Sequence, residues 1–157
     1  MKPKVYVETS VVSYCTSNPS RDLVIAGRQQ VTREWWGHHR HHFDLYISAM
    51  VLQETRKGDP SASIKREGIV KGISLLEITE AARDLADTLI HKGPIPRQFP
   101  EDALHIAIAV VHEMNFLLTW NFKHINNAQI KNDLSKIITL EGFDNPVICT
   151  PEELLGD

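Results

Sequence analysis

The chain has 157 residues, of which 42% are hydrophobic and 24% charged, and its net charge at pH 7 is −3. This length and composition favour one globular domain over residues 1–157, with a core large enough to fold without disulfides or a structural metal. The negative net charge excludes general binding of polyanions, so contact with nucleic acid would need a local basic patch or a metal ion.

The first segment, MKPKVYVE, is basic at its start, but its apolar run ends at Glu8 and is too short for a secretory signal. No later stretch approaches the roughly 20 apolar residues of a membrane span. The two cysteines, Cys15 and Cys149, have no metal-type spacing and lie in apolar sequence, which favours small buried thiols. We therefore expect a cytoplasmic protein that makes no membrane contact.

Five short apolar runs are typical of β-strands. They are KVYVE (4–8), LYIS (45–48), LLEI (75–78), FLLTW (116–120) and PVICT (146–150). Helical periodicity lies between them, in the segments 21–36, 80–90, 100–114 and 128–138. Thr79 is positioned to cap the helix that follows it, and residues 33–44 indicate a helix tail that runs into a loop.

The alternation of strands and helices favours a parallel sheet with helices on both faces. In such sheets, functional sites form at the carboxyl ends of the strands. Glu8 ends the first strand and Asn121 follows the fourth. We expect these two side chains to meet at the rim of the sheet if the two strands are neighbours.

Three carboxylates stand beside apolar sequence near the ends of predicted elements. Glu8 follows VYV, Glu54 lies in the first helix after the second strand, and Asp102 starts the most apolar helix. The helix dipole alone could explain Asp102, and Glu54 could be a solvated helix residue. Glu8 is harder to explain in that way, because an acid at the end of a buried strand is uncommon.

Four motifs, in order over the whole chain, resemble the PIN-domain family, especially the VapC-type toxins of toxin–antitoxin pairs. The motifs are VYVETSVVSY (5–14), ISAMVLQET (47–55), PEDALHIAIA (100–109) and FLLTWNFKHI (116–125). The resemblance implies a three-layer α/β/α fold with a five-stranded parallel sheet. It also implies a ribonuclease that depends on Mg²⁺ or Mn²⁺.

The resemblance maps the acidic positions of the family onto Glu8, Glu54 and Asp102, and the fourth polar position onto Asn121. Glu8 and Asp102 would be the likeliest metal ligands, and Glu54 would be either a third ligand or the group that orients a water. Asn121 would orient a water or a carboxylate, and the metal would activate a water for attack on a phosphodiester. Two positions depart from the family, which usually has aspartate where this chain has Glu8 and often a carboxylate where it has Asn121. The hydroxyl positions match Thr9, Ser10 and Thr119. From the residues alone, Thr9 or Ser10 either bonds a carboxylate or caps the first helix.

Several other side chains have two interpretations. Lys123, His124 and Arg56 are candidates for contact with the RNA backbone, or are solvated surface. The sequence HHRHH (38–42) has a pair at metal-binding spacing, His38 and His42, but without an accompanying acidic motif it favours solvated histidines. Three tryptophans could stack on bases but favour the core: Trp35, Trp36 and Trp120.

The resemblance further implies an RNA substrate, a homodimer and an antitoxin protein that contacts the early helices. Two alternatives stay open. The chain could be a catalytically silent PIN-like binding module, which the departures at Glu8 and Asn121 favour, or a structure-specific DNA nuclease of related fold.

Overall fold

The computed structural model describes residues 1–156; Asp157, the last residue of the single domain predicted over 1–157, lies outside the described residues. Five parallel strands form one sheet in the order β3-β2-β1-β4-β5. The strands are β1 (Lys4–Val7), β2 (Asp44–Ser48), β3 (Ser74–Leu76), β4 (Phe116–Leu118) and β5 (Val147–Cys149). The predicted five-stranded parallel sheet is therefore confirmed.

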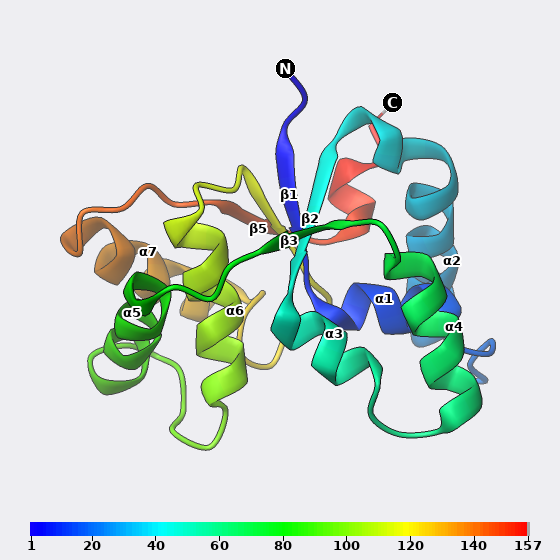
Figure 1. Cartoon of the computed structure of the whole chain (residues 1–157), viewed down its shortest axis with the longest axis horizontal. Helices are drawn as coiled ribbons and strands as arrows, with labels where there is room; N and C mark the ends of the chain where they lie inside the picture. Colours follow the sequence, from blue (N-terminus) through cyan, green and yellow to red (C-terminus); the bar gives the residue numbers. More distant parts are fainter. Residues whose placement is uncertain (157) are drawn as a thin grey trace.

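Helices cover both faces of this sheet (Figure 1). One layer contains α1 (Thr9–Thr16), α2 (Leu23–Glu34), α3 (Ala49–Thr55) and α4 (Pro60–Val70), and the other contains α5 (Glu80–His91), α6 (Pro100–Val111) and α7 (Ala128–Leu140). A short 3₁₀ turn, Pro151–Leu154, follows β5. The three-layer α/β/α arrangement matches the expectation. Within residues 1–156, every helix is too short or too polar to span a membrane.

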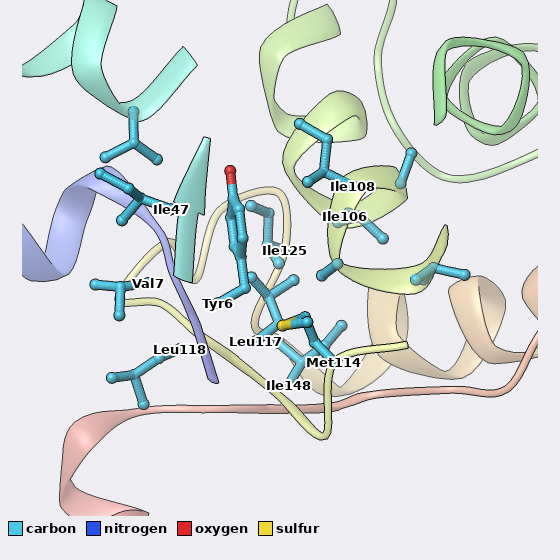
Figure 2. Packing of buried hydrophobic residues seen from close by; sticks show 14 of the residues in the cluster. Tyr6, Val7, Ile47, Ile106, Ile108, Met114, Leu117, Leu118, Ile125 and Ile148 are labelled. Atoms are coloured by element: carbon cyan, nitrogen blue, oxygen red, sulfur yellow. The ribbon is translucent and has the colours of Figure 1, made fainter. Parts of the chain in front are cut away.

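Strand β1 runs through the centre of the sheet, and its residues Val5, Tyr6 and Val7 are fully buried. Side chains alternate along a strand, so Tyr6 points toward α6 together with its neighbour Leu117. Val7 points to the opposite face together with Leu118 (Figure 2). A strand that is buried on both faces has a continuous apolar sequence, and this one delivers the next residue to the carboxyl edge of the sheet.

Residues 33–44 differ from the predicted helix tail and loop. Helix α2 continues directly into a π-helical turn, Trp35–His39, and a 3₁₀ turn, Arg40–His42. The wider turn re-aims the chain so that two consecutive indoles, Trp35 and Trp36, are both buried. Trp120 is buried as well. The interpretation of the three tryptophans as core residues is confirmed.

Both cysteines are free thiols, but only Cys149 is buried as expected, and Cys15 is partly buried. Burial raises the pKa of Cys15 above its ordinary value and raises the pKa of Cys149 to about 12. Because the thiolate is the reactive form, neither side chain is poised as a nucleophile at neutral pH.

Candidate active site

Glu8 follows β1 directly and is buried at the carboxyl edge of the sheet. Its carboxylate accepts the Ser10 N–H at 3.0 Å, which caps helix α1, and accepts the Ser10 and Thr119 hydroxyls at 2.5 Å each. The Thr119 hydroxyl also accepts the Asn121 N–H at 3.0 Å. Thr119, which follows β4, therefore connects Glu8 to the Asn121 backbone at the rim of the sheet, and within residues 1–156 no hydrogen bond joins the Glu8 and Asn121 side chains.

Glu54 sits in the last turn of α3 and faces the same edge. Its Oε1 atom accepts the Thr9 hydroxyl at 2.8 Å and the His105 Nε2–H at 2.7 Å. The other ring nitrogen of His105, Nδ1, lies 2.7 Å from the Tyr6 hydroxyl. The Tyr6 hydroxyl in turn lies 2.9 Å from the Ser48 hydroxyl. A continuous chain of hydrogen bonds thus runs from Glu54 into the core.

Thr9 and Ser10 each bond a carboxylate, which answers the question that the sequence left open. The cap of helix α1 is supplied by the Glu8 carboxylate, not by either hydroxyl. An acid at the end of this strand therefore has a structural function in addition to any chemical one.

Asp102 lies in the first turn of α6, and its backbone N–H donates a hydrogen bond to the Phe99 carbonyl at 3.2 Å. Its Oδ1 atom accepts the Asn121 Nδ2–H at 3.1 Å, and its Oδ2 atom accepts the His124 Nδ1–H at 2.8 Å. The Asn121 Oδ1 atom in turn accepts the His124 N–H at 3.0 Å. Asn121 and His124 thus orient this carboxylate together.

All three carboxylates act on one buried imidazole. Burial alone would lower the pKa of His105, but the hydrogen bond to Glu54 and the charges of Glu8, Glu54 and Asp102 raise it above its ordinary value. Burial alone would raise the pKa of Glu54, but the hydrogen bond and charge of His105, with the Thr9 hydrogen bond, lower it. The Glu54–His105 contact therefore favours a carboxylate paired with an imidazolium.

The carboxylate oxygens of the site suit a hard divalent cation, although they would not supply all of its ligands. Within residues 1–156, no group of three or more His, Cys, Asp or Glu side chains is arranged to hold a metal ion. Nevertheless, no donor among these residues contacts Glu54 Oε2, and each Asp102 oxygen accepts one hydrogen bond only. Mg²⁺ often binds one or two carboxylates and keeps several waters. The residues fit an ion held in that way.

The three candidates for substrate contact lie in different environments. Lys123 is exposed, whereas His124 is buried against Asp102. Arg56 is exposed on its loop, and its Nε atom forms an ion pair with the Glu67 carboxylate at 3.2 Å. Lys123 is therefore the cation of the three that is free to meet a phosphate.

His105 and Tyr6 contact the candidate site, although neither was among the predicted site residues. A single histidine in the apolar run ALHIAIAVV, three residues after Asp102, is the signal that could have indicated a polar contact on the same face of α6. Nothing comparable marks Tyr6, because a tyrosine in a central strand is also an ordinary core residue.

No protein-family model and no curated protein matches this sequence. The fold is similar to a chain in the crystal structure of VapBC2 from Rickettsia felis bound to a DNA fragment from their promoter. The two folds superpose with a TM-score of 0.52, over 94% of this chain and 98% of that chain, at 13% sequence identity. At this identity, the likeness supports the PIN-like fold and no more.

Proposed function

We propose that the protein is a metal-dependent endoribonuclease that hydrolyses phosphodiester bonds of RNA. The observation that carries this proposal is the convergence of Glu8, Glu54 and Asp102, from three distant segments, at the carboxyl edge of the sheet. Thr9, next to Glu8, bonds Glu54, and Thr119 links Glu8 to Asn121, which bonds Asp102. Such an edge is where parallel α/β sheets place their sites. Clustered carboxylates favour a divalent cation that offsets their mutual repulsion.

In this proposal, Glu54 and Asp102 would hold Mg²⁺ or Mn²⁺, because their carboxylates keep acceptor capacity that no donor within residues 1–156 uses, and Glu8 would add its charge beside them. When bound, the ion supplies a Lewis acid that activates water and stabilises charge on the phosphate. The other residues act by position. Asn121 and His124 fix the orientation of Asp102, and Thr9 fixes that of Glu54.

The proposal is tested by incubating the purified chain with single-stranded and structured RNA in Mg²⁺ or Mn²⁺. We expect cleavage that EDTA abolishes and that Asp102→Asn reduces by about 100-fold or more, in the range for loss of a group that stabilises charge in the transition state. Asp133→Asn, an exposed aspartate on α7, is the matched control and should cleave like the wild type.

Cleavage that survives EDTA, Asp102→Asn and Glu8→Gln together would show that this edge is not the active centre. Preference for branched DNA over single-stranded RNA would replace the proposal with a structure-specific DNA nuclease.

We extend the proposal to a toxin role with an antitoxin partner, because the similar chain belongs to VapBC2. Apolar side chains stay exposed on two helices that both pack against α1, namely Leu23 and Val24 on α2 and Ile64 on α4. Such surfaces suit a protein partner.

The toxin role is tested by expression in a bacterial host. The wild-type chain should arrest growth and the Asp102→Asn variant should not. A small protein encoded beside the gene should restore growth and co-purify with the chain. A homodimer is expected by analytical ultracentrifugation.

A second candidate, a catalytically silent binding module, is favoured by one observation. The Glu8 carboxylate already accepts three hydrogen bonds, and no three-residue metal group exists within residues 1–156. A calorimetric titration with Mn²⁺ separates the two candidates. Binding that Asp102→Asn or Glu54→Gln weakens supports the nuclease, and absence of such binding supports the module.

A further inference from the structure

Two half-exposed phenylalanines flank the candidate active site. Phe99 immediately precedes α6, which carries Asp102, and Phe122 immediately follows Asn121. Each ring is 38% exposed. They are the only aromatic side chains among the large exposed hydrophobic residues of the described chain, residues 1–156. Exposure of apolar rings is therefore concentrated at this site.

Both rings pack on a neighbouring aromatic side chain, and for Phe99 that neighbour belongs to the site. Phe99 packs on His124, with ring centroids 4.0 Å apart and planes at 34°, and His124 bonds Asp102. Phe122 packs edge-on against Trp120 with centroids 6.1 Å apart. The Trp120 Nε1–H donates to the Thr32 hydroxyl at 2.8 Å. The two rings are thus pre-organised, which lowers the entropy lost when a ligand packs on them.

A cation accompanies each ring. The Lys123 Nζ atom lies 5.8 Å from the Phe99 ring centroid, and the Arg28 Cζ atom lies 4.8 Å from the Phe122 centroid. Neither cation forms an ion pair with a carboxylate among residues 1–156, unlike Arg56, which pairs with Glu67. Two cations without a carboxylate partner among residues 1–156 therefore lie beside the two exposed rings, and Lys123 directly follows Phe122 in the chain.

A ligand that suits this surface carries flat π-faces and regularly spaced negative charges. Nucleobases stack on aromatic rings, and arginine or lysine binds the phosphates between them. A duplex hides its base faces, whereas a single strand can unstack a base onto a protein ring. We propose that Phe99 and Phe122, with Lys123 and Arg28, form a base-stacking platform that selects single-stranded RNA. Cleavage of the bound strand rests on the proposed nuclease function, but binding does not.

The platform is tested by fluorescence anisotropy with a fluorescein-labelled, mixed-sequence single-stranded RNA, the full chain, and EDTA in place of divalent ions. Phe99→Leu and Phe122→Leu should each weaken binding by roughly 5- to 100-fold, the range for one base stacked on one aromatic side chain. Phe99→Tyr and Phe122→Tyr should keep near wild-type affinity. Phe116→Leu is the matched control, since Phe116 starts β4 at the opposite edge of the sheet.

The cations are tested through salt dependence. Arg28→Gln and Lys123→Gln should each flatten the slope of log affinity against log salt by about 0.7, the contribution of one phosphate contact on a single strand. A duplex RNA and a single-stranded DNA of the same sequence serve as competitors. The single-stranded DNA should compete at least partly, because the platform reads π-faces and phosphates, and the duplex should compete poorly.

The proposal is overturned if both Leu variants bind like the wild type while thermal melts show them folded, or if the tyrosine variants lose affinity as the leucine variants do. A preference for duplex RNA, or unchanged salt slopes in both glutamine variants, would also overturn it. If the chain never cleaves RNA in Mg²⁺ but ring-dependent binding persists in EDTA, the nuclease proposal fails and the platform stands.

Discussion

Helix α6 contributes one member to each of two carboxylate–histidine pairs, and the pairs lie in different surroundings. In the inner pair, His105 of α6 bonds Glu54 of α3 at 2.7 Å. In the outer pair, Asp102 of α6 bonds His124 of the loop after β4 at 2.8 Å. The inner histidine also contacts the hydroxyl of the buried Tyr6, whereas the ring of the exposed Phe99 packs on the outer histidine.

This contrast in burial indicates that two similar hydrogen bonds at one edge of a sheet can have different functions. The inner histidine is 1% exposed and is linked by hydrogen bonds to the central strand, so its bond belongs to the fold. The outer histidine is 11% exposed and belongs to a loop that carries free polar and aromatic groups. Changes to the inner histidine, His105, should therefore act mainly on stability, whereas changes to the outer pair should act mainly on activity.

The largest expected effect is on stability. His105→Ala should lower the free energy of unfolding by about 2–4 kcal/mol, because it opens a cavity and removes one hydrogen bond each from the Tyr6 hydroxyl and the Glu54 carboxylate. His124→Ala, at the outer pair, should cost about 1 kcal/mol. Urea unfolding followed by circular dichroism measures both. Equal losses for the two variants would break the distinction between the pairs.

The next largest effect is on activity, and it should follow from a change in the outer pair. Asp102→Asn should slow RNA cleavage by about 100-fold, or about 2.7 kcal/mol in the activation barrier. Its free energy of unfolding should change by less than about 1 kcal/mol, because asparagine can still accept one of the two hydrogen bonds. A variant that unfolds at much lower urea and loses activity only for that reason would contradict the assignment of Asp102 to the chemistry.

Tyr6→Phe isolates the hydrogen bonds of the inner pair from its packing. Loss of the hydroxyl removes contacts to His105 and Ser48 in a buried position and should cost about 1–2 kcal/mol of stability. Tyr46→Phe on β2 is the matched control, since its hydroxyl makes no hydrogen bond within residues 1–156, and it should be nearly neutral. Similar losses of stability in both variants would show that the hydrogen bonds of the Tyr6 hydroxyl do not stabilise the fold.

The smallest effect is the pH dependence of stability in EDTA. The pKa of Glu54 is lowered in the folded state, so its contribution is present above its unfolded pKa of about 4.3 and is lost as the pH falls through the folded value. The pKa of His105 is raised, so its contribution is present below about 6.5 and is lost as the pH rises through the folded value.

The two contributions overlap between about pH 4.3 and 6.5. The difference in unfolding free energy between wild type and His105→Ala should therefore be largest in that window and should shrink on both sides. A difference that keeps growing above pH 7 would mean that the folded protein holds His105 neutral.

The strands and most helices could be predicted because each depends on local periodicity. Val5, Tyr6 and Val7 are consecutive apolar residues and form a strand buried on both faces. Thr79 caps α5 as the sequence indicated, accepting the Ala82 N–H at 3.1 Å. The turn after α2 could not be predicted, since it depends on how Trp35 and Trp36 pack in the core.

The sequence indicated which residues could form the candidate site, but not which hydrogen bonds they make. Motif resemblance placed Glu8, Glu54 and Asp102 at one edge, and the structure brings them there. Which donor meets which acid depends on contacts between residues far apart in sequence, such as His105 with Glu54. The exposure of Phe99 and Phe122 depends likewise on what the rest of the chain leaves uncovered.

The most direct test of the account is a crystal structure of the protein soaked in Mn²⁺, with anomalous scattering used to locate the ion. The account predicts an anomalous peak beside the carboxylates of Asp102 and Glu54, and its loss in Asp102→Asn crystals. A peak found only at the histidines of residues 38–42, or no peak at the carboxyl edge, would contradict a metal-dependent site there.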